Sequence, residues 1–240
     1  MSRAILDIWA PLAPAPLLWI VLTLAAYLAA QRLQRLCGGT PLANPVLVAI
    51  VAAAAAVLIT GTPYTTYLAA TQFISFLLGP ATVALAVPLA RNLHHIRRSL
   101  GGISVALMAG STSSIISGMG LVWLLGGNRA VALSMAPKAV TTPIAMAVSA
   151  QIGGIPTLTA TLAIMGGIVA AITGKYMLGW MRIADWRAHG LAAGVAGSGI
   201  AAARIAPLDE LAAAFAALGI ALNGLMTALL VPLLPFFWPG

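Results

Sequence analysis

Long apolar runs follow one another along almost the whole chain, separated by short stretches rich in glycine, proline or charged residues. A helix that crosses a bilayer needs about 20 apolar residues, and most of these runs approach that length. The pattern predicts an all-α polytopic membrane protein with about seven to eight hydrophobic segments, some of them broken or re-entrant. The segments cover residues 14–30, 44–60, 67–89, 103–125, 137–143, 157–176, 191–205 and 211–234.

The segment from Pro137 to Pro143 departs most from this pattern. Each proline lacks a donor N–H and crowds the preceding turn, so the pair disfavours an uninterrupted helix. Lys138, one of only two lysines, lies well inside the apolar sequence, with Thr141 and Thr142 beside it. Broken backbone in a membrane must be buried in protein or line a wet cavity. We therefore expect a broken or re-entrant element near the bilayer midplane.

The distribution of loop charges also favours a segment that does not cross. If all eight segments span the membrane, the loop cations divide six to five between the two sides. If the 137–143 segment enters and returns, they divide eight to three. Cytoplasmic loops carry an excess of Lys and Arg, so the asymmetric count agrees better with a real topology.

Composition narrows the functional classes. The 240 residues are 61% hydrophobic and 7% charged, whereas soluble domains carry about 25% charged residues. One transmembrane domain over residues 1–240 is expected, and nothing indicates a cleaved secretory signal. The net charge of +8 comes from cations scattered between apolar runs, which fits loop retention rather than nucleic-acid binding. Cys37 is the only cysteine, which excludes an intramolecular disulfide.

Enzymatic chemistry has no support in the sequence. It contains no paired carboxylates, no cluster with metal-ligand spacing, no phosphate-binding loop and no Ser/His/Asp set in one region. The four acidic residues lie at or near the ends of predicted spans. We therefore expect no enzyme activity, no metal and no cofactor.

Lys138 is the sharpest candidate for a binding residue. An ionisable group inside a membrane costs about 2.5–3.5 kcal/mol on insertion scales, and such groups usually have a function. One interpretation is coordination of a small anion, helped by Thr141, Thr142 and the N-terminus of a helix that starts near Pro143. The other is a lysine whose stem lies along apolar surface while its amine reaches the interface.

Further polar residues leave two interpretations each. Thr82 follows Gly79-Pro80 and either helps to bind a ligand or lies at a structural kink. Asn44, before Pro45, either caps a helix or contacts a ligand. Asn223, near the centre of the last segment, either forms an interhelical hydrogen bond or lies on a transport pathway.

Arg204 and the serines of the fourth segment also leave two interpretations each. Arg204 either pairs with a substrate carboxylate or forms an ion pair with Asp209 or Glu210 at a helix end. The serine and threonine residues between Ser111 and Ser117 fit close helix packing better than transport.

A weak internal similarity relates two parts of the chain. Residues 42–49 and 140–147 each place a polar residue directly before proline, and the broken stretches 78–88 and 194–204 form a second pair. Paired interruptions in two halves indicate a transporter built from inverted repeats with a midplane site. Chance similarity between alanine-rich segments is the alternative.

Four motifs resemble the LrgB/CidB family: Asn44-Pro45, L-L-G-P-A-T-V-A-L-A-V-P-L at 77–89, A-P-K-A-V-T-T-P-I-A-M at 136–146 and G-G-I-P-T-L-T-A at 153–160. The resemblance covers residues 38–234, which would form the transport region after an N-terminal helix in residues 1–37. It implies two functions. Family members were described as holin/antiholin-like modulators of murein hydrolase activity. Relatives include the plastidial glycolate/glycerate translocator and bacterial proteins linked to pyruvate uptake.

The resemblance also implies a bacterial inner (cytoplasmic) membrane location and a small LrgA/CidA-like membrane partner. One position departs from the family pattern S-H-G-I-G-T-A-R. This chain has G-S-G-I-A-A-A-R from Gly197 to Arg204, so the histidine position is Ser198. No proton-carrying role of that histidine transfers to this chain.

We therefore expect a multi-pass transporter of small monocarboxylates, namely 2-hydroxy or 2-oxo acids such as glycolate, glycerate, lactate or pyruvate. The alternative is a holin/antiholin-like regulator of lysis that acts as a homo-oligomer. The expected partners are a carboxylate anion and the lipid bilayer, without nucleic acid. The predicted substrate-binding residues are Lys138, Thr141, Thr142, Pro143, Thr82, Asn44, Ser198 and Arg204.

Overall fold

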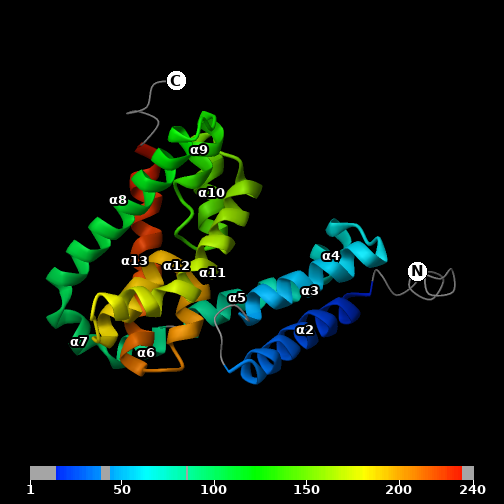
Figure 1. Cartoon of the computed structure of the whole chain (residues 1–240), viewed down its shortest axis with the longest axis horizontal. Coiled ribbons are helices and arrows are strands. Elements are labelled where there is room, and N and C mark those ends of the chain that lie inside the picture. Colours follow the sequence, from blue (N-terminus) through cyan, green and yellow to red (C-terminus); the bar gives the residue numbers. More distant parts are fainter. Residues whose placement is uncertain (1–14, 39–43, 85, 234–240) are drawn as a thin grey trace. The chain divides into compact units, whose positions relative to one another are not determined.

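The computed structural model describes residues 15–38, 44–84 and 86–233, and the regular elements among them are all helices. This confirms the all-α fold class (Figure 1). Two shorter apolar helices, α3 (Pro45–Thr60) and α10 (Thr142–Ile152), accompany four that are long and apolar enough to cross a membrane. These four are α2 (Pro16–Leu36), α8 (Leu100–Leu124), α11 (Pro156–Trp180) and α13 (Glu210–Leu230) with its 3₁₀ extension η2 (Val231–Leu233).

The first of two compact units, Met1–Ala84, contains α2, α3, α4 (Tyr64–Ala70) and α5 (Gln72–Ala84). The ring of Trp19 meets Tyr67 edge to face with centroids 5.3 Å apart, and Thr23 Oγ1 lies 3.1 Å from the Tyr67 hydroxyl. These contacts pack α4 against α2.

The segment predicted over residues 67–89 is interrupted earlier than expected. Helix α4 ends at Ala70 with Thr71 as its C-cap, and α5 begins at Gln72; α6 (Ala86–Arg91) follows residue 85, which lies outside the described residues. The Thr71 hydroxyl donates to the Tyr67 carbonyl at 2.9 Å, a back-bond that often bends helices. Pro80, the expected point of interruption, lies inside α5.

Two other sequence boundaries also shift. The first span, predicted over residues 14–30, continues to Leu36, so Arg32 and Arg35 are part of α2. The basic stretch after residue 91, which lies between two predicted segments, forms the short helix α7 (Leu93–Arg98), with exposed His94 and His95.

The second unit, Leu85–Gly240, is organised around α8 and α13, which run in the same direction. Phe215 packs in one cluster with Ile103, and Val231 in another with Met119. Between these clusters, Ser111 bonds to Asn223. Contacts therefore occur in the same order along both helices, which requires them to be parallel.

Glycines bring α12 (Trp186–Ile205) against α13. A Cβ on Gly190 would lie 2.2 Å from the Ala212 carbonyl oxygen, and one on Gly194 would lie 2.3 Å from that of Ala216. Small residues four apart allow such backbone contact between membrane helices. The contacted residue in α13 moves from 212 to 216 as the glycine in α12 moves from 190 to 194, so the first part of α12 is also parallel to α13.

Helix α12 does not continue straight, because Ser198 has φ 49° and ψ −140°. Beyond it the chain folds back, since Ala193 packs in one cluster with Ala202 and Ile205. In a straight helix Ala193 and Ile205 would be about 18 Å apart. We call residues 186–205 the second fold-back element, because another such element, described next, precedes it in the chain.

The first fold-back element comprises α9 (Arg129–Met135), the turn 136–141 and α10. The break between Met135 and Thr142 confirms that the predicted segment is not a continuous helix. Val140 packs against Ala145, while the hydroxyl of Ser134 accepts from the Ile155 backbone N–H at 2.7 Å. The chain therefore enters the unit through α9 and returns through α10 to the end from which it started.

The two ends of this unit differ in charge. The basic end is the end where α8, α12 and α13 begin and α11 finishes; the opposite end is where α8 finishes and α9 begins. Arg129 lies at the opposite end, in the first turn of α9. The described cations at or near the basic end are Arg91, Arg97, Arg98, Lys175, Arg182, Arg187 and Arg204.

Candidate functional site

The two fold-back elements enter from opposite ends and meet at Asn223. This side chain is 1% exposed and sits in the middle of α13. Its amide nitrogen donates to the carbonyls of Ala139, in the first element, and Val195, in the second, each at 3.0 Å. Its oxygen accepts from the Ser111 hydroxyl of α8. The interhelical interpretation of Asn223 is therefore confirmed.

Lys138 adjoins this junction. Its amine donates to the Ser114 carbonyl at 2.7 Å and lies 3.2 Å from the Ser114 hydroxyl, both on α8. Gly118, one turn further along α8, leaves room for the lysine, because a Cβ there would lie 2.5 Å from Nζ. The side chain is half-buried and has no acidic partner among the described residues. Its positive charge is therefore held inside the unit without neutralisation by a carboxylate.

Residues 141–143 form the start of α10, next to Lys138. Thr141 is the N-cap residue, and Pro143 occupies the first turn, where its missing N–H removes no helical bond. Thr141 and Thr142 are half-buried, and Pro143 is exposed. No side chain caps this helix start, so its N–H groups remain available to an anion.

Ser198 contributes a buried hydroxyl on the other side of the junction. Its side-chain oxygen has no hydrogen-bond partner, and the residue is 8% exposed. Its positive φ is rare for a residue other than glycine, and such strain occurs often at functional sites. Val195, whose carbonyl binds Asn223, lies one turn earlier. Ser198 therefore offers a polar atom near the junction that the fold itself does not use.

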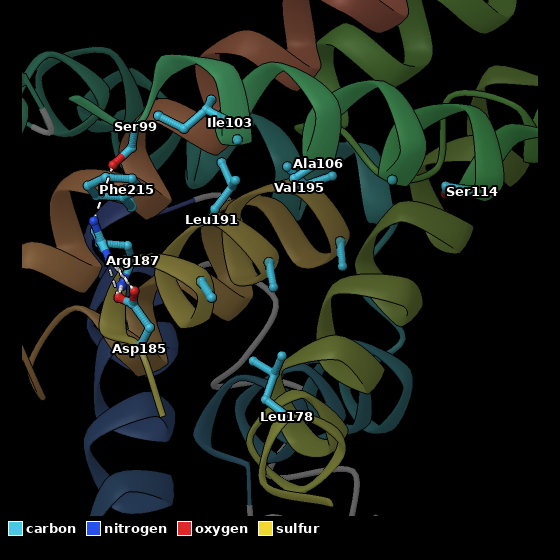
Figure 2. A pocket seen from close by; sticks show the side chains of 15 residues that line it. Ser99, Ile103, Ala106, Ser114, Leu178, Asp185, Arg187, Leu191, Val195 and Phe215 are labelled. Carbon is cyan, nitrogen blue, oxygen red and sulfur yellow. Dashed lines mark hydrogen bonds and ion pairs between the residues drawn. The ribbon is translucent and has the colours of Figure 1, made fainter. Parts of the chain in front are cut away.

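A cavity of about 700 Å³ runs between α8 and α12 from the basic end toward this junction. Figure 2 shows Ser99, Asp185 and Arg187 at one end and Ser114, which holds the Lys138 amine, at the other. The walls between them are mostly apolar, with Ile103, Ala106, Leu191 and Val195 among them. The arrangement can admit a small solute to the residue that anchors the lysine.

An ion pair lies at the mouth of the cavity. Arg187 donates to Asp185 through Nε at 2.9 Å and through Nη2 at 2.5 Å, and its Nη1 reaches the Ser99 hydroxyl at 3.4 Å. The side-chain hydrogen bonds from Arg187 hold the pKa of Asp185 below its usual range. This carboxylate is therefore ionised at neutral pH and fixes the arginine beside the opening.

Arg204 lies apart from this cavity. It is half-buried and lines a second cavity, of about 260 Å³, between α11 and the two arms of α12. The proposed pairing with Asp209 or Glu210 is wrong for the described residues. Glu210 instead lies 3.6 Å from Arg91, and Asp209 accepts from the Ala212 N–H as the cap of α13.

Two predicted site residues belong to the first unit. Asn44 is 3% exposed and accepts from the N–H groups of Val46 and Leu47 at 2.9 and 3.4 Å. Its capping role is therefore confirmed. Thr82 lies within α5, but its side chain is outside the described part of the structure.

Sequence reasoning missed Ser114 as the partner of Lys138 and assigned it only to packing. A serine in an apolar segment gives little signal by itself; the contact joins residues 24 positions apart. No group of three or more His, Cys, Asp or Glu residues in the described chain could hold a metal ion.

Comparison with known proteins finds relatives over most of the chain. Residues 23–237 match the model of the LrgB-like family. Protein YxaC of Bacillus subtilis (strain 168), whose function is uncharacterised, is 33% identical over 218 residues, 89% of this chain and 93% of its own. The antiholin-like protein LrgB of Bacillus cereus (strain B4264) is 32% identical over 222 residues, 92% of this chain and 96% of its own. No solved structure matches the chain.

Proposed function

The chain belongs to the LrgB-like family, and we propose that it transports small monocarboxylate anions across a membrane. The observation that carries the proposal is the meeting of two fold-back elements at Asn223, with Lys138 beside them. Broken helices that meet inside a membrane protein are typical of transporter binding sites. The family resemblance indicates 2-hydroxy or 2-oxo acids such as glycolate, glycerate, lactate or pyruvate as substrates.

The proposed anion site comprises Lys138, Thr141, Thr142 and the first turn of α10, with Ser198 of the second element as a further member. The lysine supplies charge, the helix start supplies N–H donors, and the unpartnered Ser198 hydroxyl supplies a further donor. Substrate reaches this site through the 700 Å³ cavity, whose mouth carries Arg187. An inverted repeat that relates residues 42–49 to 140–147 and residues 78–88 to 194–204 is part of the same proposal.

The basic end faces the cytoplasm. Among the described residues of the second unit, the loop and helix-end cations gather at this end, while Arg129 lies at the other. An excess of Lys and Arg marks the cytoplasmic side of membrane proteins. In a bacterial inner membrane, the cavity would then open to the cytoplasm.

The names of the relatives support a second candidate, an antiholin-like regulator of murein hydrolase activity and lysis. Such a protein would act through a homo-oligomer or a small LrgA/CidA-like membrane partner. It would need no binding site built around Lys138. Lysis control that survives loss of Lys138 would therefore separate this candidate from transport.

The test is uptake of radiolabelled glycolate, lactate and pyruvate into proteoliposomes that contain the purified protein. Replacing Lys138 with Met keeps the length of the stem and removes the charge. Burying an anion without a partner costs several kcal/mol, so uptake should fall more than about a hundredfold. Arg129→Met is the matched control, because it removes an exposed cation from the same fold-back element.

Size-exclusion chromatography before reconstitution shows whether each variant is intact. The control should transport at the wild-type rate. Wild-type uptake by a well-inserted Lys138→Met variant would contradict the proposed anion site. Failure of the wild-type protein to transport any of the three acids would favour the regulatory function.

A further inference from the structure

The second cavity, between α11 and the two arms of α12, has a lining with an unusual charge. Each of three chain segments contributes one stripe at helical spacing. The stripes contain Ala170, Gly174 and Met177 in α11, His189 and Ala193 in the first arm of α12, and Ala201, Arg204 and Leu208 at and beyond its second arm. The cavity therefore exists only because α12 folds back at Ser198.

Basic groups lie on the wall of this cavity without acidic partners. Lys175, His189 and Arg204 line it, and no aspartate or glutamate does. Among the described residues, neither Lys175 nor Arg204 forms a hydrogen bond or an ion pair with another side chain. The ring of His189 is held in place, because its Nε2 lies 2.8 Å from the Ile183 carbonyl. Two full charges and a polar ring thus face one space of about 260 Å³.

The rest of the lining is apolar. Met177, Leu178, Met181, Ile205 and Leu208 surround the basic groups. A ligand that fits such a wall carries both a negative group and a hydrocarbon part. The cavity lies toward the basic end, where the cations gather, and basic pockets between helices on the cytoplasmic side bind anionic lipid headgroups.

We propose that this cavity binds a phosphate group, supplied by an anionic phospholipid. Lys175 and Arg204 contact the phosphate oxygens, Arg204 through its two-pronged guanidinium. The methionine and leucine side chains accept the first part of the acyl chains. A lipid bound here would hold the returning arm of α12 against α11 and so support the strained turn at Ser198. This site is separate from the one that contains Lys138.

The experiment measures lipid retention by the detergent-purified full-length protein with native mass spectrometry. Phosphatidylglycerol and phosphatidylcholine of equal chain length are offered in competition. The wild-type protein should retain phosphatidylglycerol preferentially. Removing one surface cation weakens anionic-lipid binding about fivefold. Lys175→Gln and Arg204→Gln should each show that loss, and the double variant about twenty-five-fold.

Arg97→Gln is the matched control, because this exposed arginine lies at the same end but does not line the cavity. It should keep the preference. An equal loss in Arg97→Gln, or equal retention of the two lipids by the wild type, would overturn the proposal. Inorganic phosphate is added in a further arm. If it displaces the lipid at millimolar concentration, the site recognises the phosphate alone; if it does not, the acyl chains contribute.

Discussion

Replacing Asn223 with Leu should destabilise the second unit, because one side chain holds three elements together. Leucine has the same branched outline but cannot donate to Ala139 and Val195 or accept from Ser111. Hydrogen bonds between membrane helices contribute about 0.6 kcal/mol on average and at most about 1.7, so three give about 2–5 kcal/mol. Counting instead two buried carbonyls left without donors, at about 1–3 kcal/mol each, gives a similar 2–6 kcal/mol.

Thermal unfolding in detergent, followed by tryptophan fluorescence, measures this loss. For a chain of this size, about 2–4 °C of Tm corresponds to 1 kcal/mol, so a loss of about 2–5 kcal/mol in Asn223→Leu should lower Tm by roughly 4–20 °C. Asn223→Asp should do so too, because a carboxylate keeps the acceptor but has no N–H for the two carbonyls. Ser111→Ala is the control, since it removes only one of the three bonds and should cost about a third as much.

Two results would refute the reasoning. In one, the Tm of Asn223→Leu lies within about 1 °C of the wild-type value. In the other, Ser111→Ala costs as much as Asn223→Leu, which would place the stability in the α8 contact rather than in the two fold-back elements. Proteoliposome uptake by the same variants shows whether a looser junction also loses transport.

Two further predictions concern packing and coupling. Gly190→Ala should lower stability by about 1–3 kcal/mol in the same unfolding assay, because its Cβ would meet the Ala212 carbonyl. Gly166→Ala is the control, because a Cβ there meets no atom within 4 Å apart from the backbone of its own helix and its chain neighbours, and equal effects of the two variants would contradict the packing. Transport should not be coupled to protons, because the histidine position of the family is Ser198 and the acidic residues lie near span ends; accumulation above equilibrium that a protonophore abolishes at clamped membrane potential would show the opposite.

The candidate site was only partly accessible from the sequence. The helix break around Lys138 can be read from the sequence, because each flanking proline lacks a backbone N–H and so disrupts the helix next to it. Asn44 before Pro45 likewise indicates a helix cap that needs only the next three residues. By contrast, the partners of Lys138 and Asn223 lie on helices far away in the sequence. Ser111 and Asn223 are 112 positions apart, and no local pattern specifies that pair.

Arg204 illustrates the same limit. Its neighbours along the chain suggested a pair with Asp209 or Glu210, yet Asp209 caps α13 and Glu210 lies near Arg91. The fold-back at Ser198 places Arg204 on the wall of the second cavity. A single residue with positive φ is not visible in a glycine- and alanine-rich segment, where a continuous short helix is an equally good interpretation.

The sequence by itself determined the all-α membrane class, the family and the break around Lys138. These follow from composition, apolar run length and proline, which act through solvent transfer and local backbone geometry. Only the tertiary structure decided that two elements return to the ends from which they enter, that they meet at Asn223, and that Lys175 and Arg204 share a cavity. Those features depend on which helices pack together. That choice is made by contacts between separate helices, such as the close approach of Gly190 to the backbone of α13.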